Sequence, residues 1–337
     1  MKNNIADLEK LLANAVNPNI VITTHHKPDA DALGSSLGLY NYFTQKGIKA
    51  QVITPTDYPE FIHWMPGNDT VINFEAEEAK SAELVKAADF IFCLDFNVLK
   101  RINALGDIVE AATATKVMID HHQSPGDFAE YVLWTTKASS TCELIYQFIK
   151  EMGDEALINA DIANCLMAGI IADTGSFKFD STTANTFRIA AELTEKGANS
   201  NEIQTQLFDN NSFTRTKLMG FAASERLEIL EEYNTALMYL TADDLKRFNV
   251  KTGDTEGFAN IGLSIKGIKL STIIIDRTVL VKMSFRVKGD FPAHEFSAKY
   301  FNGGGHQKAS GGQSELTLEE TIAKFKDALK EYKDYLK

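Results

Sequence analysis

Short runs of Val, Ile and Phe, separated by helical patterns, constrain the fold of this chain more than any other feature. Each run is apolar throughout and lacks the alternation of a strand with one face in water. Such runs are typical of strands buried on both faces of a parallel sheet that helices cover. We expect strands at 19–24, 50–54, 89–95 and 116–120, and helices at 31–47, 75–87, 139–152 and 159–172.

The pattern changes near residue 190. Residues 188–232 predict an unbroken helical segment rich in Glu, Ala and Leu, as suits a connector between domains. Further on, apolar runs again predict strands, and the last segment predicts a helix that starts with a capping box. These later elements are a strand at 234–240, two strands within 269–287, and a helix that begins at Thr317 and Glu320.

The length of 337 residues suits about two domains. We expect an α/β domain over 1–190, with a mainly parallel sheet flanked by helices. A helical linker over 191–229 then leads to a smaller α+β domain over 230–337.

Charge and cysteine content exclude several classes of protein. Lys and Arg number 34 against 46 Asp and Glu, so the net charge is −12 and a role in coating long nucleic acid is not expected. The odd cysteine count, with no CxxC pair, indicates a reducing compartment and core positions for Cys93, Cys142 and Cys165. The N-terminal segment lacks the layout of a signal peptide, and no run of about 18 apolar residues predicts a membrane span. We therefore expect a cytoplasmic protein with no membrane partner.

Four of the seven histidines form two His-His pairs, each beside aspartates and just past a predicted strand. In the first pair's segment, HHKPDAD, His25, Asp29 and Asp31 follow the strand at 19–24. Ligands of open parallel sheets gather at this end of the strands. For Asp31 alone, an N-cap of the next helix is an equally good interpretation. For His25 alone, a strand-end histidine with its hydrogen bonds satisfied is favoured over a ligand.

Three further segments place Asp or His at corresponding positions. Asp95 ends one predicted strand, Asp120-His121-His122 ends another, and Asp173 lies at the end of a helical stretch. Each aspartate alone could be a turn residue. Together they favour a site rich in carboxylate oxygens with some imidazole, which suits Mn²⁺ or Mg²⁺. Two such cations are typical of hydrolysis at phosphorus.

The stretch GGGHQKASGG at 303–312 holds five of the chain's 21 glycines. Glycines let backbone N–H groups approach an anion closely, and a flexible surface turn is the less favoured alternative. His306, Lys308 and Arg286 would supply donors for a phosphate or a base. The stretch lacks the ending of a Walker A motif. Of the other histidines, we interpret His26 as a neighbour of the site, and His63 and His294 as ordinary surface or loop residues.

The order of these motifs resembles the DHH phosphoesterases, from HxxPDxD (25–31) through Asp95 and DHH (120–122) to Asp173. The GGGH at 303–306 resembles the DHHA1 domain of one branch of that family. The layout is most similar to stand-alone oligoribonucleases of the NanoRNase type, which also dephosphorylate adenosine 3′,5′-bisphosphate (pAp). The resemblance covers about 15–190 and 230–330.

The resemblance implies two metal sites that share Asp95, occupied by divalent cations, Mn²⁺ foremost, with Mg²⁺ and Co²⁺ as alternatives. The residues implied are His25, Asp29 and Asp95 for one cation, and Asp31, Asp95, His121 and Asp173 for the other. The implied catalytic residues are His122, which would contact the scissile phosphate, Asp95 and Asp120. The implied substrate-binding residues are Arg286, Gly303, Gly304, Gly305, His306 and Lys308. Asn302, Phe96 and Val287 depart from the family pattern, which affects the expected substrate preference but no metal ligand.

The activity implied is hydrolysis of short oligoribonucleotides to mononucleotides and of pAp. A phosphodiesterase for linear or cyclic dinucleotides, a family II inorganic pyrophosphatase, and a nucleotide-sensing module with an inactive site are the alternatives. The expected partners are short oligoribonucleotides, pAp or dinucleotides, and neither long nucleic acid nor a membrane. The sequence leaves open a homodimer, the metal in the cell and the direction of degradation.

Overall fold

The computed structural model describes residues 5–337 and forms two compact units, the first ending at Asn210 and the second beginning at Asn211. Residues 1–4 lie outside the described residues. They are the start of the N-terminal segment for which the sequence predicts no signal peptide. In the described part of the chain, no helix has the length and apolarity that crossing a bilayer requires. The finer division at 190 and 230 stays a prediction.

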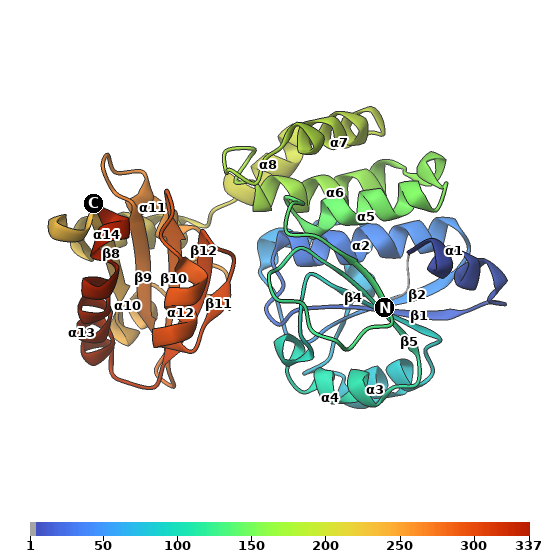
Figure 1. The fold of residues 1–337 in the computed structure, drawn as a ribbon, viewed down its shortest axis with the longest axis horizontal. Coiled ribbons are helices and arrows are strands. Elements are labelled where there is room, and N and C mark those ends of the chain that lie inside the picture. The colour runs from blue at the N-terminus through green and yellow to red at the C-terminus, as the bar shows by residue number, and fades with distance from the viewer. Residues whose placement is uncertain (1–4) are drawn as a thin grey trace. The chain divides into compact units, whose positions relative to one another are not determined.

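A six-stranded sheet forms the centre of the first unit (Figure 1). Its strands all run parallel to their neighbours, in the order β3-β2-β1-β4-β5-β6. They are β1 (Asn19–Thr24), β2 (Lys49–Thr54), β3 (Ile72–Asn73), β4 (Phe90–Leu94), β5 (Thr115–Asp120) and β6 (Tyr131–Trp134). The predicted parallel sheet and its four long strands are confirmed. The sequence analysis missed the two edge strands, because β3 is very short and β6 is only partly buried.

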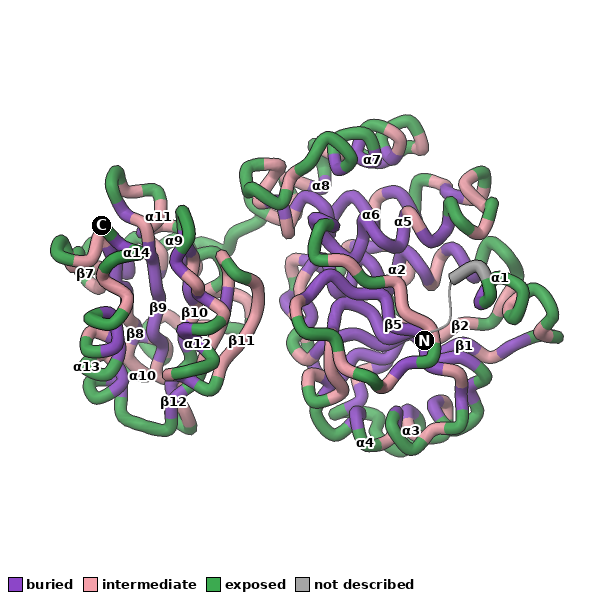
Figure 2. The backbone as a smooth tube through the Cα atoms, viewed as in Figure 1, coloured by how far each residue is buried: buried purple, intermediate pink, exposed green. Residues whose placement is uncertain are grey.

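Both faces of this sheet are buried, as its continuous apolar strands require. Along β1, Ile20 and Ile22 belong to one hydrophobic cluster and Val21 to another. Along β4, Phe92 and Cys93 divide between the same two clusters. Figure 2 shows these strands as buried backbone between layers of helix.

Helices cover the two faces of the first sheet unequally (Figure 1). Side chains of α2, α5 and α6 fill one cluster, and those of α3 and α4 fill the other. The helices of this unit are α1 (Ile5–Asn14), α2 (Ala30–Gln45), α3 (Glu78–Lys86), α4 (Leu105–Ala111), α5 (Thr141–Glu151), α6 (Ala160–Asp173), α7 (Ala184–Glu195) and α8 (Ser200–Phe208).

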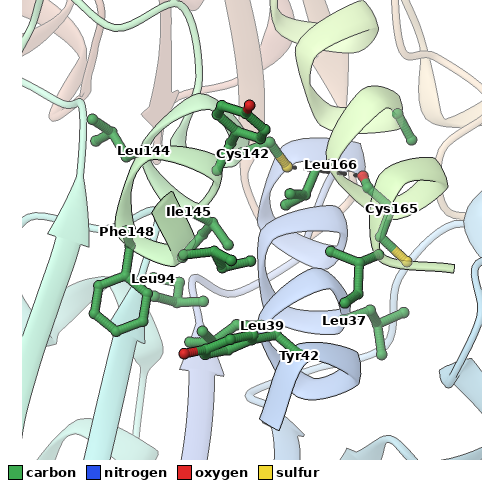
Figure 3. Close-up of a cluster of buried hydrophobic side chains, with 14 of the residues drawn as sticks. Leu37, Leu39, Tyr42, Leu94, Cys142, Leu144, Ile145, Phe148, Cys165 and Leu166 are labelled. Carbon is green, nitrogen blue, oxygen red and sulfur yellow. Dashed lines mark hydrogen bonds between the residues drawn. The ribbon is translucent and has the colours of Figure 1, made fainter. Parts of the chain in front are cut away.

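The three cysteines are confirmed as core residues. Cys142 and Cys165 lie among Leu37, Leu166 and their neighbours in the larger cluster (Figure 3), and Cys93 lies in the smaller one. Burial raises the pKa of all three thiols, so they stay protonated and unreactive.

The segment predicted to be helical throughout, 188–232, is instead broken at 196–199 and 209–212 and ends in a strand. After α7, α8 and α9 (Phe213–Glu225), residues Leu227–Leu230 form strand β7. This strand pairs antiparallel with the next and forms an edge of the second sheet. The Glu- and Leu-rich composition favours helix locally, and the pairing overrides it.

The second unit is built on a mixed sheet in the order β11-β12-β10-β9-β8-β7. Only β8 and β9 pair in parallel. The strands besides β7 are β8 (Thr235–Leu240), β9 (Leu270–Asp276), β10 (Val281–Val287), β11 (Gly304–Gly305) and β12 (Ala309–Ser314). The helices besides α9 are α10 (Ala242–Arg247), α11 (Phe258–Leu263), α12 (Ala293–Phe301), α13 (Leu318–Ala328) and α14 (Lys333–Leu336). This α+β architecture is as predicted, and Thr317 and Glu320 cap α13 as expected. The terminal helix is nevertheless interrupted, because a 3₁₀ turn at Leu329–Tyr332 separates α13 from α14.

The glycine-rich stretch 303–312 is a β-hairpin and not a flexible turn. β11 pairs with β12, which joins the sheet through β10. A Cβ on Gly303 would lie 2.8 Å from the Cα of Gly312, so no larger residue fits there. The sequence analysis missed these strands because Gly and Ser have low strand propensity, and here they serve close contact between backbones.

Candidate metal centre

The carboxyl edge of the first sheet gathers the polar residues that the sequence analysis singled out. His25 follows β1, Asp95 follows β4, and Asp120 ends β5. Neighbouring parallel strands end at the same edge, so these three segments meet there. Two helices complete the cluster, since Asp31 lies in the first turn of α2 and Asp173 is the last residue of α6.

His25, Asp29 and Asp95 form a first group of potential ligands. Nε2 of His25 lies 3.3 Å from Oδ2 of Asp95 and 4.0 Å from Oδ2 of Asp29. Nδ1 of His25 donates to the carbonyl oxygen of His26 over 2.9 Å. That bond places the proton on Nδ1 and turns Nε2 toward the carboxylates, which is the orientation of a metal-binding imidazole.

Asp29, and not Asp31, is the N-cap of α2. Its Oδ1 accepts hydrogen bonds from the backbone N–H groups of Asp31 and Ala32, both at 3.0 Å. The alternative interpretation of Asp31 as the cap is therefore wrong. Asp31 is fully buried, and its carboxylate accepts from the N–H groups of Thr141 at 2.7 Å and Cys142 at 2.9 Å.

Asp31, His121 and Asp173 form a second group. Nε2 of His121 lies 3.3 Å from Oδ2 of Asp173 and 3.7 Å from Oδ2 of Asp31. Close packing of α2 against α6 makes this possible. A Cβ on Gly169 of α6 would lie 2.6 Å from Oδ1 of Asp31, so a glycine is required where α6 passes the carboxylate.

Asp95 lies between the two groups. Its Oδ2 lies 3.3 Å from Nε2 of His25, and its Oδ1 lies 3.4 Å from Nε2 of His121. The hydroxyl of Thr141 donates to Oδ1 over 2.9 Å and holds the carboxylate in this position. The backbone of Asp95 has φ +62°, a left-handed conformation that is uncommon outside glycine and concentrates at functional sites.

His122 and Asp120 form a pair beside Asp95. Nδ1 of His122 donates to Oδ1 of Asp120 over 2.8 Å, and this bond fixes the orientation of the imidazole ring. Oδ2 of Asp120 is buried and accepts no hydrogen bond from the residues that the structure describes. Burial lowers the pKa of His122, against the hydrogen bond to Asp120, which raises it.

The electrostatics of the cluster are those of carboxylates that need cations. Burial and the nearby charge of Asp95 raise the pKa of Asp31 to about 7, and burial and the charge of Asp31 raise the pKa of Asp173. Burial opposes ionisation of Asp95 as well, but the neighbouring imidazoles of His121 and His25 hold its pKa well below the usual range. Burial by itself would lower the pKa of His121. The carboxylates of Asp95 and Asp173 outweigh this effect and raise the pKa to about 10. Carboxylate oxygens with imidazole are a donor set that suits Mn²⁺ or Mg²⁺, so the residues fit the metals that the sequence predicts.

Arg101 is a residue of this edge that the sequence analysis missed. It lies in the 3₁₀ turn Leu99–Ile102 after β4, and its carbonyl oxygen accepts from both N–H and Nδ1 of His26. Its side chain forms no ion pair with any described residue, yet its charge lowers the pKa of His122 further, after burial. Nothing in the local sequence marks it, because its position depends on the loop after β4 turning toward the cluster.

In the second unit, Arg286 and the glycine hairpin lie together. Arg286 on β10 is the register partner of Ala309 on β12, and the N–H of Val287 donates to the carbonyl of Lys308 over 3.0 Å. His306 lies in the turn, where its N–H donates to Ala309 over 2.8 Å. The structure thus brings the predicted substrate-binding residues to one end of the second sheet.

The remaining histidines follow the predictions with one exception. His26 lies beside the site through its bonds to Arg101, and His63 is an exposed residue against the ring of Tyr58. His294 is not in a loop, because it lies on α12 next to Gly304 of the hairpin.

Comparison with known proteins agrees with this geometry. Residues 19–170 match the N-terminal domain of the DHH family, and residues 234–337 match the DHHA1 domain. The chain is 30% identical to the bifunctional oligoribonuclease and PAP phosphatase NrnA of Bacillus subtilis over 87% of this chain and 88% of the relative. For the NrnA of Thermus thermophilus the identity is 29%, over 94% and 91%. A crystal structure of an exopolyphosphatase-related protein from Bacteroides fragilis, 38% identical, superposes with a TM-score of 0.93 over 98% of this chain and 97% of that one. The chain therefore belongs to the DHH family, in the branch that carries a DHHA1 domain.

Proposed function

We propose that the chain is a two-metal phosphoesterase that hydrolyses short oligoribonucleotides to mononucleotides and dephosphorylates pAp. The observation that carries the proposal is Asp95, whose two carboxylate oxygens face His25 and His121 in two separate ligand groups. The names of the Bacillus and Thermus relatives, which match this chain over most of its length, supply the substrates.

Each cation has its own set of proposed ligands. One would be held by His25, Asp29 and Asp95, and the other by Asp31, Asp95, His121 and Asp173. We propose Mn²⁺, with Mg²⁺ and Co²⁺ as alternatives. When bound, two such cations lower the pKa of a water and offset the charge that develops on a phosphoryl group.

The protein's own residues orient the phosphate. Asp120 holds the ring of His122 through Nδ1, and we assign Nε2 of His122 to the substrate phosphate. A phosphate oxygen at Nε2 is a hydrogen-bond acceptor and favours the protonated ring, whose charge Asp120 balances. Arg101, a cation with no ion-pair partner among the described residues, is suited to a second phosphate oxygen.

We assign substrate binding in the second unit to Arg286, His306, Lys308 and the backbone N–H groups of Gly303, Gly304 and Gly305. Guanidinium, imidazole and ammonium groups beside a glycine-rich backbone are suited to a nucleotide phosphate. The net charge of −12 provides little attraction for a long polyanion, so short substrates are favoured. We also propose a cytoplasmic location, with short oligoribonucleotides, pAp or dinucleotides as the partners of the enzyme. A homodimer is compatible with this function.

A cyclic dinucleotide phosphodiesterase is the second candidate. The cyclic-di-AMP phosphodiesterase PdeA of Listeria monocytogenes is 24% identical over 93% of this chain, but the match spans 47% of PdeA. The candidate thus shares the two domains, and this chain aligns with only half of that enzyme.

One assay separates these functions. Purified protein with Mn²⁺ is given pAp, pyrophosphate, cyclic di-AMP and RNA of 2, 5, 15 and 24 nucleotides. The proposal expects turnover of pAp and the highest kcat/KM on the 2- and 5-nucleotide RNA. Preference for cyclic di-AMP or pyrophosphate would replace it by that alternative, and equal cleavage of the 24-nucleotide RNA would contradict the preference for short substrates.

A further inference from the structure

Trp134 lies at the candidate metal centre, and neither the sequence motifs nor the proposed mechanism use it. It is the last residue of β6 and one of only two tryptophans in the chain. Its side chain is 39% exposed. A single exposed apolar side chain needs no explanation by itself. The fixation of the Trp134 side chain beside the candidate metal centre does need an explanation.

The indole ring is fixed beside the catalytic pair. Its Nε1–H donates to the carbonyl oxygen of His122 over 2.6 Å. In addition, Trp134 is the register partner of Asp120 on the neighbouring parallel strand. Register partners on parallel strands project to the same face, about 4.8 Å apart, so the ring stands next to the Asp120–His122 pair. One edge of the indole is therefore used to hold it in place, while part of its surface stays open to solvent.

We propose that Trp134 is a platform on which a nucleobase of the substrate stacks. The inference rests on the proposed function, because the phosphate that brings the base to the ring is the phosphate that His122 contacts. Every base has a π-face, so stacking on an aromatic side chain tolerates any sequence. That property suits an enzyme that degrades RNA fragments of all sequences. Stacking also contributes binding energy for the nucleotide, which the net negative charge of the chain does not provide.

The indole ring of Trp134 is held in position before a base binds. An aromatic side chain held by a hydrogen bond loses little freedom when a base stacks on it, so less binding energy is lost to ordering. Arg101, from the loop after β4, supplies positive charge near the same histidine. A nucleotide bound at this edge would thus have its phosphate between His122 and Arg101 and its base on Trp134.

Kinetics with matched substrates test the platform. Trp134→Leu removes the aromatic face, Trp134→Phe keeps an aromatic face without the N–H donor, and Trp64→Phe is the control at the other tryptophan. Each is assayed with Mn²⁺ on the dinucleotide pApA and on its analogue with both bases removed. We expect Trp134→Leu to lower kcat/KM on pApA about tenfold, within the range for a base stacked on an aromatic ring, and to leave the abasic analogue unchanged. Trp134→Phe should lose less, and the control nothing.

Fluorescence gives a readout that does not depend on turnover. In Trp64→Phe, Trp134 is the only tryptophan, and a stacked base should quench its emission. The probe is a dinucleotide whose bridging oxygen is replaced by methylene, so that this bond is not hydrolysed. Saturable quenching by this probe, absent with its abasic form, is the expected result.

The outcomes separate the two levels of the account. Equal losses on pApA and on the abasic analogue, or no quenching, would overturn the platform and leave Trp134 as a clamp on the His122 segment. Absence of pApA hydrolysis by the unsubstituted protein would instead overturn the proposed function, and the quenching experiment would still decide whether a base stacks on Trp134.

Discussion

The two regions that we assign to catalysis hold their groups in opposite ways. At the edge of the first sheet, the proposed metal ligands His25, Asp31, Asp95 and His121 are buried side chains from separate segments. In the second unit, the proposed substrate-binding groups lie on or beside one glycine hairpin and are only half-buried.

The difference follows from what each region binds. Buried carboxylates that converge on one point repel each other, so they must be held in place by other bonds before a cation arrives. Thr141 and Cys142 provide those bonds at the N-terminus of α5. A nucleotide has to enter and leave with each turnover, and half-buried donors on a hairpin allow that. Substitutions in the first region should therefore abolish metal binding and hydrolysis. Substitutions in the second region should weaken substrate binding.

The largest effect is expected for Asp95→Asn. A neutral amide cannot serve two cations, so kcat should fall by about a thousandfold or more, roughly 4 kcal/mol in activation free energy. Steady-state kinetics on pAp measure this, with circular dichroism as the control for folding. A variant that keeps more than about a tenth of the kcat would show that Asp95 does not bridge.

Thr141 tests how strongly positioning matters at the first region. Thr141→Val removes the hydroxyl that donates to Oδ1 of Asp95 and keeps the shape of the side chain, while Thr141→Ser keeps the hydroxyl. The valine variant should lose roughly 10- to 100-fold in Mn²⁺ affinity, the usual effect of removing a partner of a metal ligand. Calorimetric titration measures the affinity. Equal Mn²⁺ affinities in the valine and serine variants would show that the hydroxyl of Thr141 does not position Asp95 for metal binding.

His306→Ala probes the second region against His121→Ala in the first. Loss of His306 should raise KM about tenfold with kcat nearly unchanged, whereas loss of His121 should lower kcat through loss of metal. The metal content of both variants is measured alongside the kinetics. If His306→Ala lost as much Mn²⁺ as His121→Ala, the division between the two regions would be wrong.

The smallest effect concerns a charge pair of the second unit that lies outside both proposed sites. Burial would raise the pKa of Asp244, but hydrogen bonds from Arg226 and Thr241 lower it below the usual value. A carboxylate with a lowered pKa stabilises the fold above its unfolded pKa of about 3.9, and this stability is lost as the pH falls through the folded pKa.

Asp244→Asn should therefore cost roughly 1–2 kcal/mol at pH 7, and the difference from the unsubstituted protein should shrink below about pH 4. Denaturant unfolding at several pH values measures it, and kcat should not change. A difference independent of pH would contradict the assignment.

The first region could be predicted largely from sequence because its signals are local. Apolar runs mark the strands, and the aspartates and histidines stand directly after them. What could not be predicted are contacts made by backbone groups or by distant loops. The N–H groups of Thr141 and Cys142 bind Asp31 whatever their side chains are, and Arg101 reaches the site only through the fold of its loop.

The second unit was harder to predict for a related reason. Leu227–Leu230 and Ala309–Ser314 become strands by pairing with neighbours, against the composition of the first and the high glycine content of the second. Local propensity carries no information on such partners. The cap at Asp29 shows the same limit on a smaller scale, since both Asp29 and Asp31 have the composition of an N-cap and only the geometry distinguishes them.

The most direct test of the central claim is the number of Mn²⁺ ions that the chain binds. Calorimetric titration of metal-free protein should give two ions per chain, and Asp95→Asn should bind one or none at the same concentrations. Two ions bound with unchanged affinity by Asp95→Asn, or a single ion bound by the unsubstituted chain, would contradict a centre in which Asp95 joins two cations.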